Sequence, residues 1–119
     1  FVSVHDVVQA NLLAMEPGRG DGNALNIGSG ESVSIAQVAQ ILETSMDVNI
    51  PLEITGKYRA GDIRHCYADI SEARRVLGYQ PKYRLADGVG ELVGWLRSQT
   101  AEDHVSEATS QLTAFGLTA

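Results

Sequence analysis

The sequence predicts an α/β fold with a few short strands and several helices. Three observations support this class. Apolar residues recur with a helical period in several segments, short alternating segments lie between them, and glycine or proline separates most of these elements. This order fits an α/β or an α+β arrangement, and 119 residues are enough for one domain with one modest core.

The first half of the chain alternates strand and helix patterns. Residues 1–4, FVSV, read as a short strand, and Asp6 is expected to open a helix that ends at the glycine-rich loop 16–23. Residues 24–27 form the next expected strand, and Ser34 is a good N-cap for the helix that follows it. The apolar face of that helix consists of Ile35, Val38, Ala39, Ile41 and Leu42.

The second half of the chain contains one more extended segment and three helices. Residues 50–56 alternate apolar and polar side chains, which is typical of a strand. Gly78 is well placed to end the first of the helices, SEARRVLG. Asp69 or Ser71 is expected to cap this helix. The second helix is expected to start at Asp87, and the last one to run through residues 101–114.

The expected strands are few and short. They would leave much of each helix face uncovered unless a sheet elsewhere packed against it. The chain also starts at Phe1 inside a strand-like alternation, with no cap or turn before it. We therefore expect that an N-terminal part precedes these residues in the intact protein.

Composition excludes several classes of protein. The net charge is −6 and the chain has only two lysines, so a basic face for nucleic acid is absent. The single cysteine, Cys66, excludes an internal disulfide framework and fits a reducing cytoplasm. No apolar run approaches the roughly 20 residues that a membrane-spanning helix needs. The first residues have no basic stretch, so we do not expect them to be a signal peptide.

The segment 26–34, NIGSGESVS, lies between a strand and a helix, as a dinucleotide-binding turn would. Gly28 and Gly30 match such a turn, but Val33 stands where the third glycine should be. A structural turn is therefore the favoured interpretation.

Other catalytic and metal patterns are weaker. Ser3, His5 and Asp6 resemble members of a triad, but Asp6 is more simply explained as a helix cap. Cys66 beside His65 lacks the third and fourth ligands of a zinc site. A Tyr-x-x-x-Lys pair is absent from the sequence.

The densest polar stretch is YRAGDIRHCYAD, residues 58–69. Arg59 and Arg64 could bind phosphate through their planar forks, and Gly61 allows a close approach of the backbone. Asp62 could accept hydrogen bonds from ligand hydroxyls or pair with an arginine. The alternative is a surface loop of solvated charges.

The order of three segments resembles a known family. FVSVHDVVQANLLAM, ALNIGSGESVSIAQVAQIL and the stretch from Tyr58 to Leu96 are similar to the C-terminal part of an extended short-chain dehydrogenase/reductase. The family is the NAD-dependent epimerase/dehydratase family, which includes UDP-glucose 4-epimerase and dTDP-L-rhamnose 4-epimerase-like proteins. The resemblance implies a C-terminal substrate-binding lobe, with a Rossmann-type NAD-binding domain in an N-terminal part outside residues 1–119.

The resemblance also implies roles for four residues. Arg59 would hold the diphosphate of a nucleotide sugar, and Asp62 would lie near the ribose. Cys66 would lie beside the sugar, where a small residue leaves room for a larger hexose. Arg64 has no equally firm family role and would make a second ionic contact or an internal ion pair.

The activity implied for the full enzyme is epimerisation of a UDP- or dTDP-hexose. NAD in the N-terminal domain would oxidise the sugar at its 4-hydroxyl and return the hydride to the opposite face. The catalytic Ser or Thr and the Tyr-x-x-x-Lys pair would belong to that domain, so we expect residues 1–119 to bind no NAD and to be inactive alone. The full protein is expected to be a cytoplasmic homodimer.

Two other functions stay open at this level. A nucleotide-sugar 4,6-dehydratase or reductase of the same family would use a similar lobe. A stand-alone binding or interaction module, without catalysis, would also explain the lack of catalytic residues.

Overall fold

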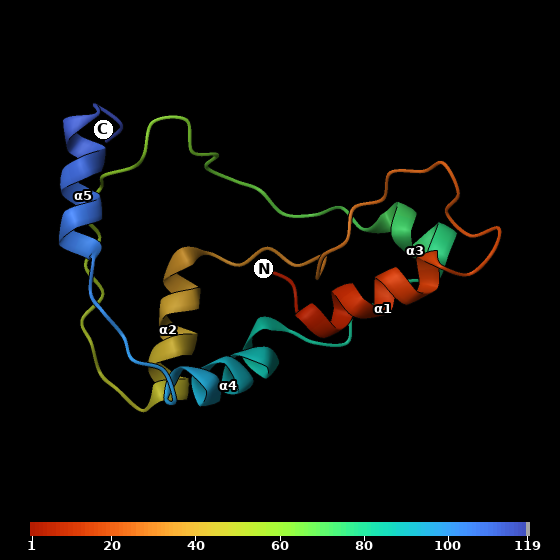
Figure 1. Cartoon of the computed structure of the whole chain (residues 1–119), viewed down its shortest axis with the longest axis horizontal. Helices are drawn as coiled ribbons and strands as arrows, with labels where there is room; N and C mark the ends of the chain where they lie inside the picture. Colours follow the sequence, from red (N-terminus) through yellow and green to blue (C-terminus); the bar gives the residue numbers. More distant parts are fainter. Residues whose placement is uncertain (119) are drawn as a thin grey trace.

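The computed structural model describes residues 1–118 and contains five helices (Figure 1). They are α1 (Val4–Ala14), α2 (Ile35–Met46), α3 (Ser71–Leu77), α4 (Leu85–Leu96) and α5 (Val105–Ala114). α1 packs with α3 and α2 packs with α4, while α5 stands apart at one end of the molecule. No helix among the described residues is long and apolar enough to cross a membrane.

The chain is more open than a compact domain of its length. Its radius of gyration is 18.0 Å, whereas roughly 13–14 Å is expected for a compact chain of this size. The larger apolar cluster lies between α1 and α3 and comprises Ala10, Ile70, Ala73, Leu77 and Tyr79. Val89 and Val93 of α4 supply the buried side chains of the α2–α4 pair. The helices are therefore held as two small units rather than around one core.

Several predicted helix ends are confirmed. Ser34 caps α2 in a reciprocal arrangement, because its hydroxyl accepts a hydrogen bond from the amide of Gln37 while the Gln37 side chain accepts one from the Ser34 amide. Gly78 ends α3 in the left-handed region at φ 68°. The predicted cap of α3 is wrong, because the N-cap is Ile70 rather than Asp69 or Ser71. Asp69 Oδ1 does accept a hydrogen bond from the Ser71 amide at 2.9 Å, and hydrogen bonding from Ser71 lowers the pKa of Asp69.

The prediction of three strands is wrong: none of them forms a regular strand within residues 1–118. Val4 of the segment 1–4 already belongs to α1, and residues 24–27 and 50–56 have no regular secondary structure. The one β-bridge recorded there joins Arg59 to Thr118. An extended segment becomes a strand only when a neighbour shares its ladder of hydrogen bonds, and an alternating pattern cannot show whether that neighbour exists.

Three helix starts also differ from the prediction. Ser3, rather than Asp6, is the N-cap of α1. α4 begins at Leu85, two residues before Asp87, whose carboxylate accepts a hydrogen bond from the Arg84 amide at 3.1 Å. α5 begins at Val105 rather than at residue 101. In the first two cases an acidic residue of the first turn was taken for the cap itself.

Asp6 links α1 to the segment that precedes α4. Its side chain is almost fully buried, with 1% of the residue exposed. Its two carboxylate oxygens accept hydrogen bonds from the amides of Lys82, at 2.8 Å, and Tyr83, at 3.2 Å. A buried carboxylate is stable only with such partners, so Asp6 fixes where the 79–84 segment crosses α1.

Tyr79 forms a second link across the sequence. The residue is fully buried, and its hydroxyl donates a hydrogen bond to the carbonyl of Gly28 at 2.9 Å. Burial raises the pKa of the Tyr79 phenol, and the negative charge of Asp6 adds to this effect. The bond ties the glycine turn to the loop after α3.

We predict that Asp6→Ala destabilises the protein by about 2–4 kcal/mol, because two buried amides lose their acceptor. Urea unfolding followed by helical circular dichroism measures the change in free energy of unfolding. Asp21→Ala is the matched control, since Asp21 is exposed. A loss equal to that of the control would contradict the structural role of Asp6.

We predict that Tyr79→Phe lowers stability by about 1–2 kcal/mol at neutral pH, because the Gly28 carbonyl loses its donor. The neutral phenol is favoured in the folded state, so the unaltered protein loses stability as pH rises above about 10, the ordinary tyrosine pKa. This part of the pH dependence should be absent from Tyr79→Phe and present in Tyr58→Phe, whose ring is exposed. Urea titrations between pH 8 and 11 measure it, and identical alkaline slopes would refute the assignment.

Candidate functional site

The four predicted site residues lie in one exposed segment between α2 and α3. The chain is irregular here and turns at Gly61, whose φ of 87° is in the left-handed region. The amide of Asp62 donates a hydrogen bond to the carbonyl of Arg59 at 3.1 Å, which closes the turn. The turn therefore presents Arg59 and Asp62 together at the surface.

Arg59 and Asp62 form an ion pair across this turn. Arg59 Nε lies 3.5 Å from Asp62 Oδ2, and the two side chains are 64% and 61% exposed. An exposed pair of this kind contributes little to stability, so a ligand can compete for either partner. The sequence left two roles for Asp62, and the structure shows the pairing with arginine.

Arg64 and Cys66 follow in the same exposed segment. Within residues 1–118, neither is joined to the Arg59–Asp62 pair by a hydrogen bond or an ion pair. Lys57, Arg59 and Arg64 oppose the single carboxylate of Asp62 in residues 57–66, a local charge of +2 in a chain whose net charge is −6. This local excess of positive charge favours an anion.

The glycine turn after residue 26 is closed by packing. A Cβ on Gly28 would lie 2.7 Å from the Ala68 Cβ, and one on Gly30 would lie 2.9 Å from the Ile70 Cδ1. Gly30 also has a φ of 73°. These glycines are needed for close contact with the segment before α3, which supports the structural interpretation.

The residues of the rejected triad have structural contacts. Ser3 accepts a hydrogen bond from the His5 amide as the cap of α1, and Asp6 binds the backbone amides described above. His5 Nε2 instead lies 2.8 Å from Glu91 Oε2 on α4. Among the described residues, no group of three or more His, Cys, Asp or Glu side chains is arranged to hold a metal ion.

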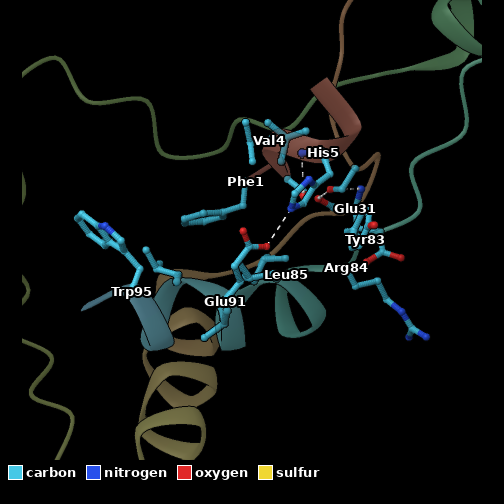
Figure 2. A pocket seen from close by; sticks show the side chains of 16 residues that line it. Phe1, Val4, His5, Glu31, Tyr83, Arg84, Leu85, Glu91 and Trp95 are labelled. Carbon is cyan, nitrogen blue, oxygen red and sulfur yellow. Dashed lines mark hydrogen bonds and ion pairs between the residues drawn. The ribbon is translucent and has the colours of Figure 1, made fainter. Parts of the chain in front are cut away.

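A cavity that the sequence did not indicate lies between the start of α1 and α4 (Figure 2). Its volume is about 530 Å³, and its lining is mostly apolar, with Phe1, Leu92 and Trp95 among the large side chains. None of the four predicted site residues lines it. Trp95, which lies outside the predicted apolar stripe of its helix, is 58% exposed.

Comparison with known proteins shows what the chain is similar to. The chain is 37% identical over 101 residues to dTDP-L-rhamnose 4-epimerase of Burkholderia thailandensis, a match that covers 83% of this chain. It is 36% identical to UDP-glucose 4-epimerase of Thermotoga maritima, whose crystal structure with UDP-glucose superposes with a TM-score of 0.71 over 81% of this chain. The chain is similar to the C-terminal portion of these 4-epimerases, in agreement with the resemblance to the NAD-dependent epimerase/dehydratase family.

Other members support the same relationship. UDP-glucose 4-epimerase of Mycolicibacterium smegmatis is 32% identical over 84% of this chain. UDP-glucose 4-epimerase of Stenotrophomonas maltophila, solved with bound NAD and formylated UDP-arabinopyranose, is 32% identical over 82% of this chain with a TM-score of 0.71. No family model matches the chain.

The chain spans about 30% of the length of these relatives. It covers 27% and 31% of the two curated enzymes and 30% and 29% of the two solved chains. It corresponds to the C-terminal portion of an extended short-chain dehydrogenase/reductase. The predicted fold class is thereby confirmed: the helix-rich chain with almost no strands is the C-terminal lobe of that Rossmann-type fold.

Proposed function

We propose that these residues form the substrate-binding lobe of an NAD-dependent nucleotide-sugar 4-epimerase acting on a UDP- or dTDP-hexose. The observation that supports this most strongly is the 37% identity to dTDP-L-rhamnose 4-epimerase over 101 residues. A second support is that the similar Thermotoga maritima structure contains UDP-glucose. The ligand would be the nucleotide-diphosphate sugar.

In this proposal Arg59 binds the diphosphate and Asp62 lies near the ribose. Their ion pair would open on binding, because the guanidinium fork matches two phosphate oxygens better than one carboxylate oxygen at 3.5 Å. The released Asp62 carboxylate can then accept hydrogen bonds from ribose hydroxyls. Holding the diphosphate would use remote binding energy to position the sugar while its reacting carbon turns.

Cys66 and Arg64 have supporting roles in the proposal. The exposed Cys66 would lie beside the sugar, where its small side chain leaves room for a substituted hexose. Arg64 would add a second ionic contact, consistent with the local positive charge of its segment. Neither residue would take part in proton or hydride transfer.

The chemistry of the reaction would belong to an N-terminal NAD-binding domain outside residues 1–119. That domain would supply NAD and the Ser or Thr and Tyr-x-x-x-Lys groups. We further propose that the intact enzyme is a cytoplasmic homodimer. Epimerisation is preferred to 4,6-dehydration, to reduction and to a stand-alone binding role, because the relatives described above are named 4-epimerases.

We predict that Arg59→Ala weakens the binding of UDP or dTDP by about 2–4 kcal/mol, because a desolvated phosphate loses a charge-assisted donor. Isothermal titration calorimetry on the protein expressed from the complete reading frame measures the dissociation constant. Arg97→Ala is the matched control, since Arg97 is an exposed arginine at the end of α4. An unchanged dissociation constant for Arg59→Ala would count against the assignment.

We also predict that residues 1–119 alone give no NAD-dependent turnover of UDP-glucose or dTDP-L-rhamnose. Proton NMR of the sugar after long incubation with NAD detects inversion at carbon 4. The Thermotoga maritima enzyme serves as the active control. Epimerisation by the purified 119-residue chain would refute the proposal that an N-terminal domain supplies the catalytic groups.

A further inference from the structure

The candidate site lies in the middle of a long connection. Residues 47–70 join α2 to α3 without regular secondary structure, and connections longer than about 12–15 residues are uncommon inside a domain. The connection is held at its start, where Glu43 Oε1 accepts a hydrogen bond from the Ile50 amide at 2.9 Å. It is held at its end by Ala68, which packs against the α1–α3 core.

Between these two points, the C-terminal tail holds the connection. The amide of Ala60 donates a hydrogen bond to the carbonyl of Leu117 at 2.8 Å, and Arg59 pairs with Thr118 in an antiparallel bridge. Among the hydrogen bonds and ion pairs of residues 1–118, the bond from Ala60 to Leu117 is the one that joins residues 51–67 to a distant part of the chain. Figure 1 shows the connection passing beside the C-terminal end of α5.

The tail is itself fixed to α5. Gly116 has a φ of 65° and donates to the Thr113 carbonyl at 3.0 Å, and the Leu117 amide donates to the Leu112 carbonyl at 2.9 Å. These two bonds form the usual glycine ending of a helix, which turns the chain back on itself. The Thr118 hydroxyl adds a contact of 3.3 Å to the Thr113 hydroxyl. The direction of the Leu117 carbonyl is therefore set by the end of α5.

We propose that residues 115–118 form a clamp that positions Arg59 for a nucleotide diphosphate. This inference rests on the proposed function of Arg59. Leu117 is a positioning residue, which acts through its carbonyl on the backbone of Ala60. Fixing the backbone next to Arg59 removes part of the ordering cost that a free loop would incur on binding, and it keeps the guanidinium fork in register with the phosphates.

The test compares Gly116→Val with Gly22→Val. Both glycines have positive φ and open space around them, but Gly22 lies in the loop after α1, outside the connection and the C-terminal tail. A branched residue at Gly116 should break the helix ending and release the tail. We expect the dissociation constant for UDP, or for dTDP if that is the nucleotide bound, to rise about tenfold or more. Gly22→Val should leave it within about twofold of the unaltered chain.

A chain that ends at Gly116 is the second variant, because it keeps α5 and its glycine while removing the Leu117 carbonyl. Amide hydrogen exchange at Ala60, measured by NMR without nucleotide, gives a readout that does not depend on Arg59. We expect protection at Ala60 in the unaltered chain and in Gly22→Val, and its loss in Gly116→Val and in the shortened chain.

The outcomes separate the two proposals. Nucleotide binding that is unchanged in Gly116→Val and in the shortened chain would overturn the clamp and leave the role of Arg59 intact. An unaltered chain that binds neither UDP nor dTDP would overturn the role of these residues alone as a substrate-binding lobe. In that case, amide exchange at Ala60 would test the clamp. Loss of protection in both variants would show that the tail holds the backbone at Ala60, and unchanged exchange would overturn the clamp.

Discussion

The buried carboxylate of Asp6 is the constraint on which the arrangement of helices depends. It lies in the first turn of α1 and accepts hydrogen bonds from two amides more than 70 residues away. A charged group in this position costs several kcal/mol if its partners are lost, so the 79–84 segment has little freedom to move along α1. That segment leads directly into α4, and α4 packs with α2. Asp6 thus ties the two small helical units together, and the His5–Glu91 contact and the Tyr79–Gly28 bond add to this link.

Two helix ends that depend on neighbouring residues were predicted correctly from the sequence. The Ser34 cap and the Gly78 ending depend on residues within one helical turn, and both are present as expected. The strands at 1–4, 24–27 and 50–56 failed because pairing depends on a neighbour that an alternating pattern does not reveal. Asp6 was misread for a related reason: an acidic residue near a helix start is usually a cap, and only the tertiary contacts with Lys82 and Tyr83 give it another role.

The residues of the candidate site could be predicted from the sequence, but the contacts that hold them in place could not. The sequence grouped Arg59, Asp62, Arg64 and Cys66 in one stretch, and the structure places all four in one exposed segment, with Arg59 and Asp62 paired. The apolar cavity of Phe1, Leu92 and Trp95 was missed, because it depends on how α1 meets α4. The contact between Ala60 and Leu117 was equally hidden, since no motif in the tail identifies a backbone carbonyl as a partner.

The turn at Gly61 combines three exposed cations with an irregular backbone that is held at few points. Proteases that cleave after lysine or arginine need such a segment to adapt to their own active sites, and helical regions resist them. Lys57, Arg59 and Arg64 therefore offer such proteases cleavable bonds in this segment. Whatever occupies the turn would shield those bonds, so the pattern of proteolytic fragments reports occupancy of the site without any measurement of catalysis.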